Sequence, residues 1–113
     1  MTRSVYPSVT QELASKRRDL SPDLQTAFEA FGTRVFRDGA LPVKTKQLIA
    51  VAVAHVTQCP YCIESHTKAA LRHGASQPEL MEAIWVAAEM RAGAAYAHSA
   101  IALAVMAERE PPA

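Results

Sequence analysis

The sequence predicts an all-α fold, on the evidence of its composition and its apolar spacing. Alanine occurs 22 times against only four glycines, and alanine both favours helices and lets them pack closely. Apolar residues recur at helical spacing, as at Leu24, Phe28, Phe31 and Val35. The length of 113 residues, half of them hydrophobic, fits one domain over residues 1–113. Because alanine buries little surface per residue, self-association would add stability.

The charge pattern excludes several classes of partner. The formal net charge is +1, with neither a basic stripe nor an acidic tail, so nucleic acids and anionic membranes are not expected partners. Residues 1–10 lack the apolar core of a signal peptide, and the longest aliphatic run, residues 48–54, is too short to span a bilayer. We therefore expect a cytoplasmic protein.

Two helices are expected in the first third of the chain. Ser8 can cap the first, with Gln11 at the capping-box position, and this helix should end near the charged run of residues 16–19. Ser21, Pro22 and Asp23 fit the N-cap, first position and acidic first turn of the second helix. Its apolar spacing stops at Asp38 and Gly39, which predicts a helix over residues 22–37.

Two further helices are expected in the central part of the sequence. Pro42 can open the first of them, whose apolar body at residues 48–54 is uniform and should be buried nearly all round. A strand is disfavoured there, because no second apolar run offers itself for pairing. Another helix should begin at Cys59 or Pro60 and stop at Gly74.

The last part of the chain should form two helices. Ser76 and Glu79 make a capping box, and the helix that follows is expected to break near residues 91–93, at a glycine. A final helix over residues 94–108 is apolar on almost every face, so part of it should meet another subunit. Residues 108–113 then read as a polar tail.

Residues 55–66 hold both cysteines and two of the four histidines. On a helix that begins at Cys59 or Pro60, the two cysteines share a face, and so do Cys62 and His66. The amides at the helix start stabilise a thiolate at Cys59, while His66 can exchange a proton with Cys62. In a reducing compartment such a pair is a redox dithiol rather than a structural disulfide. These residues alone leave open which sulfur attacks a substrate.

The two cysteines have two other interpretations. They can be inert core thiols, or they can bind zinc together with His66 and either His55 or His73. Structural zinc sites usually take ligands from two separated knuckles, and this chain has no second one. His55 and His73 are therefore expected to have structural positions near helix ends, and no metal or organic cofactor is predicted.

A longer set of residues resembles the carboxymuconolactone decarboxylase superfamily, and more narrowly its alkylhydroperoxidase D (AhpD) branch. The resemblance covers residues 27–107, and the positions that match are Leu41-Pro42-x-Lys44-x-Lys46, Leu48-Ile49-Ala50, His55-Val56-Thr57-Gln58-Cys59-Pro60-Tyr61-Cys62, His66 and Gly74. It implies an all-helical fold in which a helical hairpin presents the Cys-x-x-Cys motif. It also implies assembly into trimers or hexamers.

The resemblance further implies an activity and a role for each site residue. Cys62 would attack a hydroperoxide, Cys59 would resolve it as an intramolecular disulfide, and an external dithiol or protein reductant would complete the cycle. His66 would relay a proton together with a glutamate of the family. That glutamate is replaced here by Gln47, in Lys46-Gln47-Leu48, which can orient His66 but cannot accept a proton as a carboxylate does.

Two other functions stay open. One is a redox-sensing oligomer with weak enzymatic activity, which Gln47 favours because the relay acid is missing. The other is a small-molecule decarboxylase or isomerase of the carboxymuconolactone type that uses histidines as acid and base. Members of that branch generally lack the Cys-x-x-Cys pair, so the chain resembles them less.

Overall fold

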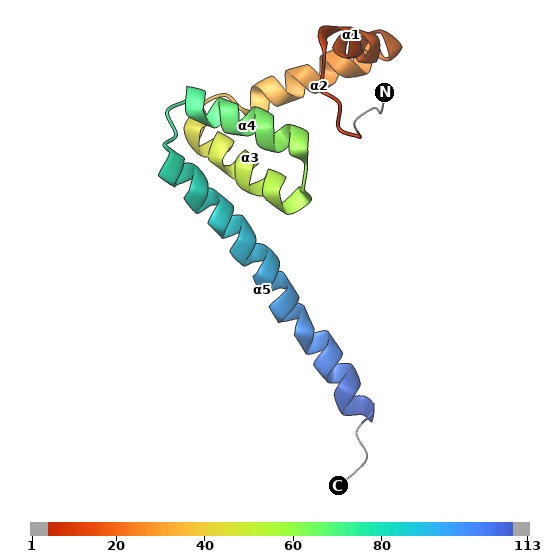
Figure 1. Cartoon of the computed structure of the whole chain (residues 1–113), viewed down its shortest axis with the longest axis vertical. Helices are drawn as coiled ribbons and strands as arrows, with labels where there is room; N and C mark the ends of the chain where they lie inside the picture. Colours follow the sequence, from red (N-terminus) through yellow and green to blue (C-terminus); the bar gives the residue numbers. More distant parts are fainter. Residues whose placement is uncertain (1–4, 110–113) are drawn as a thin grey trace. The chain divides into compact units, whose positions relative to one another are not determined.

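In the computed structural model, which describes residues 5–109, every regular element is a helix. The helices are α1 (Gln11–Leu20), α2 (Pro22–Val35), α3 (Val43–Thr57), α4 (Pro60–Arg72) and α5 (Gln77–Arg109) (Figure 1). The prediction of an all-α fold is confirmed. The chain divides between Lys46 and Gln47 into two units, which are considered in turn.

Helix α1 begins later than expected, because a different hydroxyl caps it. Thr10 Oγ1 accepts the N–H of Leu13 at 3.2 Å, and the Thr10 carbonyl accepts the N–H of Ala14 at 3.0 Å. The predicted cap at Ser8 is wrong, since the residue that both precedes the helix and has a hydroxyl in reach is Thr10. The helix also continues through the charged run to Leu20.

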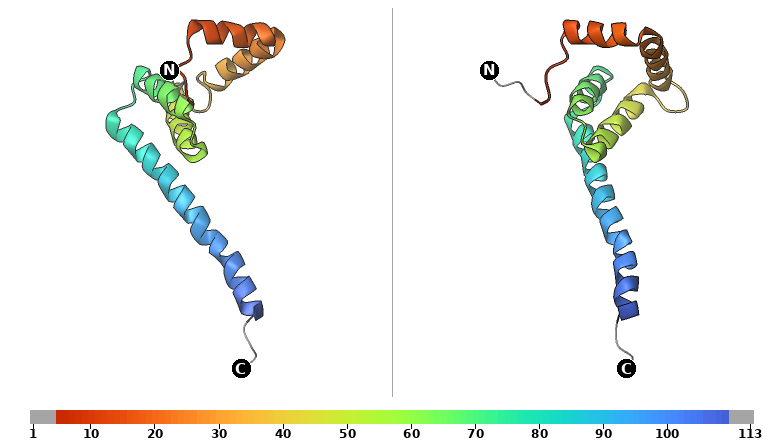
Figure 2. Two further views of the ribbon diagram at one scale, coloured as in Figure 1. Left: turned by 45° about the vertical axis from the view of Figure 1, so that its right-hand side comes forward. Right: turned by 90° about the vertical axis from the view of Figure 1, so that its right-hand side faces the viewer.

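Helix α2 follows α1 after a bend at Ser21, which Figure 2 shows as the junction of two short helices. Pro22 occupies its first turn as predicted. The helix ends at Val35 rather than at residue 37, because the Lys46 ammonium donates to the carbonyls of Val35 at 2.8 Å and Arg37 at 2.7 Å. This contact gives carbonyls at the end of α2 a charged donor and anchors the loop that leads to α3.

In the second unit, α3 and α4 lie side by side and run antiparallel (Figures 1 and 2). The predicted helical hairpin is therefore confirmed. Its core contains Val51, Ala70, Ala75 and Leu80, with Leu48 and Ile84 packed against them.

The uniform apolar body of α3 is not buried all round within this chain. Val51 is fully buried, but Ile49 is 47% exposed and Val53 is 52% exposed. The expectation for residues 48–54 is therefore wrong for the single chain, because α3 has neighbours on only part of its circumference.

Helix α5 is one unbroken helix of 33 residues, so the predicted break near residues 91–93 and the separate helix over residues 94–108 are wrong. The capping box at its start is confirmed: Glu79 Oε1 accepts the N–H of Ser76 at 2.8 Å, and Ser76 Oγ accepts the N–H of Glu79 at 3.2 Å. A glycine inside a helix costs only about 1 kcal/mol relative to alanine. The alanines around Gly93 offset that cost.

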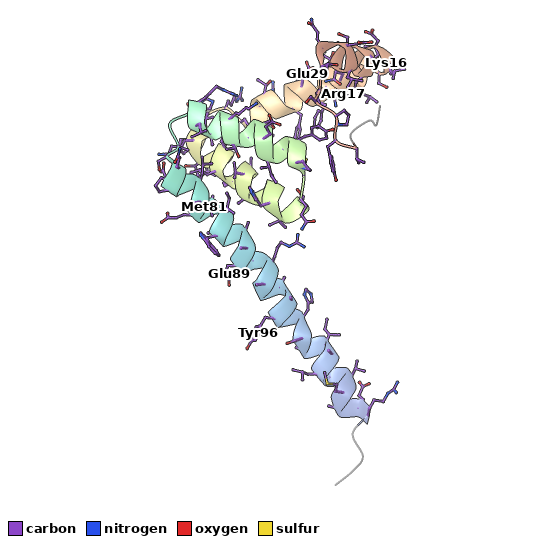
Figure 3. All side chains as sticks on the ribbon, viewed as in Figure 1. Lys16, Arg17, Glu29, Met81, Glu89 and Tyr96 are labelled. Atoms are coloured by element: carbon purple, nitrogen blue, oxygen red, sulfur yellow. The ribbon has the colours of Figure 1, made fainter. Side chains whose placement is uncertain are left out.

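The far half of α5 has no cover within the second unit. Leu80 and Ala87 are the buried residues of the helix, and every residue from Ala94 to Arg109 is exposed. Tyr96, 82% exposed, projects from this half (Figure 3). Among the residues that the structure describes, no helix is both long enough and apolar enough to cross a membrane.

Candidate redox site

The site is built on the short link between α3 and α4. Gln58 adopts a left-handed backbone conformation, with φ 58°, and the N–H of Cys59 donates to the carbonyl of Ala54 at 3.1 Å. This six-to-one hydrogen bond is the signature of a Schellman ending for α3. The Cys59 carbonyl then accepts the N–H of Ile63 at 2.9 Å, so the residue that closes α3 also starts α4.

Cys59 is the N-cap of α4, and its side chain is the capping group. Cys59 Sγ accepts the backbone N–H of Cys62 at 3.3 Å. Both cysteines are free thiols and both are half-buried. The prediction that the Cys-x-x-Cys motif lies at a helix start is confirmed, and the two residues occupy the N-cap and third positions, which face each other on the first turn.

The surroundings divide the two thiols into a stronger and a weaker acid. The hydrogen bond from the Cys62 thiol lowers the pKa of Cys59, and the backbone amides of Cys62 and Tyr61 lower it further. The same thiol–thiol hydrogen bond raises the pKa of Cys62, with further contributions from its burial and from the charge on Cys59. These interactions favour the thiolate form at Cys59 and the thiol form at Cys62.

Gln47 and His66 meet on the inner side of the hairpin. His66 Nδ1 lies 2.8 Å from Gln47 Oε1, and Gln47 is only 6% exposed. An amide oxygen can only accept, so Nδ1 bears the proton and Nε2 bears the lone pair. His66 lies one helical turn beyond Cys62, so the imidazole and the Cys62 thiol share one face of α4.

The other histidines use Nδ1 within their own helices or lie at a helix end. His55 Nδ1 donates to the carbonyl of Val51 at 2.7 Å, and His98 Nδ1 donates to that of Ala94 at 2.8 Å. His73 is the C-cap of α4, as the sequence predicted. Across residues 5–109, no three His, Cys, Asp or Glu side chains are grouped so that they could hold one metal ion.

Sequence reasoning missed two supports of this site. Arg91 of α5 donates from its guanidinium to the carbonyl of Val56, in the last turn of α3. That contact joins residues 35 apart in the chain, so a local sequence pattern does not predict it. The left-handed Gln58 was missed as well, because the helix-ending signal expected at such a position is a glycine.

Fold and site together define a class: an all-helical protein whose helical hairpin presents a dithiol at a helix start, with a histidine one turn further on. The sequence profile described as the carboxymuconolactone decarboxylase family matches residues 22–105. The chain belongs to this family.

The chain is also similar to individual proteins. "Uncharacterized protein 4 in cox locus" of Paracoccus denitrificans is 67% identical over 85 residues, which are 75% of this chain and 77% of that one. The crystal structure of a carboxymuconolactone decarboxylase family protein from Legionella pneumophila is 39% identical, with a TM-score of 0.65 over 68% of this chain and 69% of that one.

A third relative bears on function. A carboxymuconolactone decarboxylase family protein from Thermotoga maritima, for which involvement in the antioxidative response has been suggested, is 35% identical, with a TM-score of 0.54. The match covers 56% of this chain and 65% of that one.

Proposed function

We propose that the protein is a thiol-dependent peroxidase of the AhpD type, which reduces hydroperoxides through a Cys59–Cys62 disulfide. The observation that supports this most is the pair of hydrogen-bonded free thiols at the start of α4. The Gln47–His66 hydrogen bond, which fixes the basic nitrogen of a nearby imidazole, adds to it. The antioxidative role suggested for the Thermotoga relative is in keeping with such an activity.

The proposed cycle starts at Cys62. Its thiol proton passes to Nε2 of His66, and its sulfur attacks an oxygen of the hydroperoxide. The O–O bond breaks, the leaving alkoxide takes the proton from Nε2 of His66 and departs as an alcohol, and a sulfenic acid forms on Cys62. The Cys59 thiolate then attacks the Cys62 sulfur, the S–O bond breaks, and the leaving hydroxide takes from solvent the proton that Cys59 had released, so that water leaves as the disulfide forms. Two electrons have passed from the dithiol to the peroxide.

Turnover then requires a partner that supplies two electrons. An external dithiol or a protein reductant would open the disulfide by thiol exchange. The residues named here supply all the groups that the cycle uses, so the proposal requires neither a metal nor an organic cofactor. We also propose that the working form is a homo-oligomer, a trimer or a hexamer, since the far half of α5 is apolar and exposed.

Peroxide reduction with a dithiol donor tests the proposal. Cys62→Ser should abolish turnover and should form no sulfenic acid. Cys59→Ser should also stop turnover, but a single addition of peroxide should leave one sulfenic acid at Cys62, which mass spectrometry can locate. Sulfenic acid on Cys59 of the Cys62→Ser variant would remove Cys62 from the attacking role, and undiminished turnover in both variants would end the proposal.

A second candidate function is favoured by Gln47. The pair that it forms with His66 contains no carboxylate, which suits a slowly oxidised redox sensor better than a fast enzyme. Slow disulfide formation with a change in oligomer size on oxidation would support the sensor. Fast and sustained turnover would exclude it.

A further inference from the structure

The side of α5 that packs on the α3–α4 hairpin continues beyond the end of that hairpin (Figure 1). Leu80 and Ala87 are the buried residues of α5, and the same interval of seven leads on to Ala94 and Ile101. Seven residues make almost two whole helical turns, so these four residues lie close to one side of the helix. Residues 94–109, which we call the α5 overhang, are all exposed. The packing face of α5 is thus covered in its first half and uncovered in its second.

Helix α3 has an uncovered apolar face in the same unit. Ile49, Val53 and Val56 recur at intervals of four and three residues, so they share one face of the helix, and they are between 38% and 52% exposed. We call these three residues the α3 stripe. The buried Val51 and Ala54 lie on the opposite side of α3. The stripe is therefore additional to the surface that α3 uses in the hairpin core.

We propose that the α5 overhang of one copy packs along the α3 stripe of a neighbouring copy. The inference rests on the homo-oligomer of the proposed function and identifies the two surfaces that build it. Each copy provides one overhang and one stripe. In a closed symmetric assembly every overhang then meets a stripe, and neither surface is left without a partner.

The two surfaces match in length. Helix α3 has 15 residues and is about 22 Å long, and the overhang, which extends from Ala94 to Arg109, is about 24 Å long. A stable interface engages about 20 to 30 residues on each partner. A copy that uses both its overhang and the exposed side of α3 comes close to that number, whereas either surface alone does not.

Neither surface contains a charged side chain at its centre. Residues 47–63 and residues 92–107 contain no Asp, Glu, Lys or Arg. Contact between the two segments therefore brings apolar side chains together without removing a carboxylate, an ammonium or a guanidinium group from water.

The other helical surfaces of this unit bear charges beside their apolar residues. The exposed Trp85 has Glu82 and Glu89 as neighbours on α5, at three and four residues. The surface of α4 bears the exposed ion pair between Lys68 and Glu64. Covering either surface with the overhang would desolvate charged groups. The α3 stripe is the surface that the overhang covers at the lower cost.

Two variants with complementary losses test the contact. Val53→Lys places a charge in the stripe, and Ile101→Glu places one in the overhang. Each alone should weaken association at least tenfold in sedimentation at micromolar concentration, because an unpaired charge would be buried. An equimolar mixture should form assemblies that contain both chains, since the intact overhang of one variant fits the intact stripe of the other. Native mass spectrometry identifies the mixed species.

The matched control is Gln77→Lys, which adds a charge at the exposed start of α5 and should assemble like the parent. Val53 is half exposed in the single chain, so Val53→Lys should keep its helix content in circular dichroism. Ile49→Lys, one turn earlier on the stripe, takes its place if it does not fold.

Unchanged assembly of a folded Val53→Lys, or a mixture that stays dissociated, would overturn the inference. A parent that sediments as a monomer would overturn it together with the oligomer, whether or not the protein reduces peroxide. Because the measurement is mass and not turnover, complementary assembly without peroxide reduction would refute only the proposed peroxidase.

Discussion

Gln47 and His66 are the residue pair at which this chain differs from the AhpD pattern that its sequence resembles, and the difference concerns charge. The amide oxygen of Gln47 holds Nδ1 of His66 at 2.8 Å, as a carboxylate would. It supplies the orientation but no negative charge, so it does not favour the imidazolium that forms when His66 takes a proton.

Gln47→Glu should therefore speed up peroxide reduction. A carboxylate at this position adds a negative charge beside His66 Nδ1 and stabilises the imidazolium, and a general acid–base group of this kind is worth roughly 10²- to 10⁴-fold in rate. Gln47→Leu, which removes both the charge and the hydrogen bond, is the matched control and should be slower than the parent. A glutamate variant that reacts no faster would mean that the relay runs through another group, such as Glu64 or His55.

The different acidities of the two thiols predict two separate alkylation profiles. The pKa of Cys59 is lowered and that of Cys62 is raised, and alkylation follows the thiolate. Iodoacetamide should therefore modify Cys59 with a midpoint below the ordinary pKa of a cysteine, and Cys62 with a midpoint above it. Peptide mass mapping across the pH range measures both.

The lowered pKa of Cys59 also makes the stability of the fold depend on pH. Because folding lowers the pKa of Cys59, this residue stabilises the fold above the ordinary cysteine pKa, and the contribution is lost as the pH falls through the lowered value. Cys62 acts in the opposite sense. A single alkylation midpoint shared by both cysteines would contradict the division of acidity.

At this scale the sequence predicted much of the site. The three-residue spacing of the cysteines and the four-residue spacing to His66 determine which side chains share a helix face. Gln47 lies 19 residues from His66, and its place beside that histidine came from the family resemblance rather than from spacing. The sequence also predicted that the amides at the helix start stabilise a thiolate at Cys59, and the N–H of Cys62 does donate to Cys59 Sγ. It left open which of the two sulfurs attacks a substrate.

At the scale of the helices, the link between α3 and α4 contains a residue in an unfavourable backbone conformation. Gln58 has a positive φ, a conformation that costs a residue with a Cβ atom roughly 1 kcal/mol or more. The corresponding position after α4 is Gly74, with φ 89°. There the N–H of Ala75 donates to the carbonyl of Ala70 at 2.9 Å, in the same six-to-one pattern.

Placing glycine at position 58 and alanine at position 74 tests the free-energy cost assigned to the left-handed conformation. Gln58→Gly should raise the free energy of unfolding by about 1 kcal/mol, because glycine adopts the left-handed conformation without steric cost. Gly74→Ala should lower it by about 1 kcal/mol, although a Cβ there would meet no other atom within 4 Å, because its only cost is the backbone conformation. Urea unfolding measures both. A destabilising Gln58→Gly would show that the Gln58 side chain makes a net contribution to the link.

Helix starts were more predictable than helix ends. Pro22, Pro60 and the Ser76–Glu79 box are local signals, and each lies where the sequence indicated. The end of α2 depends on Lys46, which lies 11 residues beyond Val35, and the continuity of α5 through Gly93 depends on the helix preference of its neighbours. Those decisions rest on distant contacts or on summed propensities, which a local pattern does not encode.

At the scale of the whole molecule, the main feature is the apolar surface of α5, which this chain leaves exposed. At 1.5 Å per residue the helix is about 50 Å long, and residues 92–107 contain no charged side chain. Ile101, Leu103, Val105 and Met106 are each about half exposed or more. Water is an unfavourable environment for so much continuous apolar surface, and further copies of the chain are the partner that we propose.

A charge placed in this segment should therefore disrupt assembly. Ile101→Asp should shift sedimentation at micromolar concentration toward smaller species or lower the solubility, since burying an unpaired carboxylate in an interface is costly. Gln77→Glu adds the same charge at the start of α5, away from the apolar segment, and should leave assembly unchanged. A parent protein that sediments as a stable folded monomer would refute the oligomer.

The backbone of Cys59 both ends α3 and begins α4. This position affects how the protein would withstand oxidative stress. A sulfenic acid on Cys62 faces two fates: condensation with Cys59, or attack by a second peroxide to the sulfinic acid, which thiols do not reverse. Hydrogen bonds on both sides of Cys59 hold its sulfur beside Cys62, and fixed intramolecular partners reach effective concentrations of roughly 10⁵ M or more in favourable cases. Peroxide in a cell never approaches such values. The link between α3 and α4 would thus protect the proposed enzyme from inactivation by its own substrate.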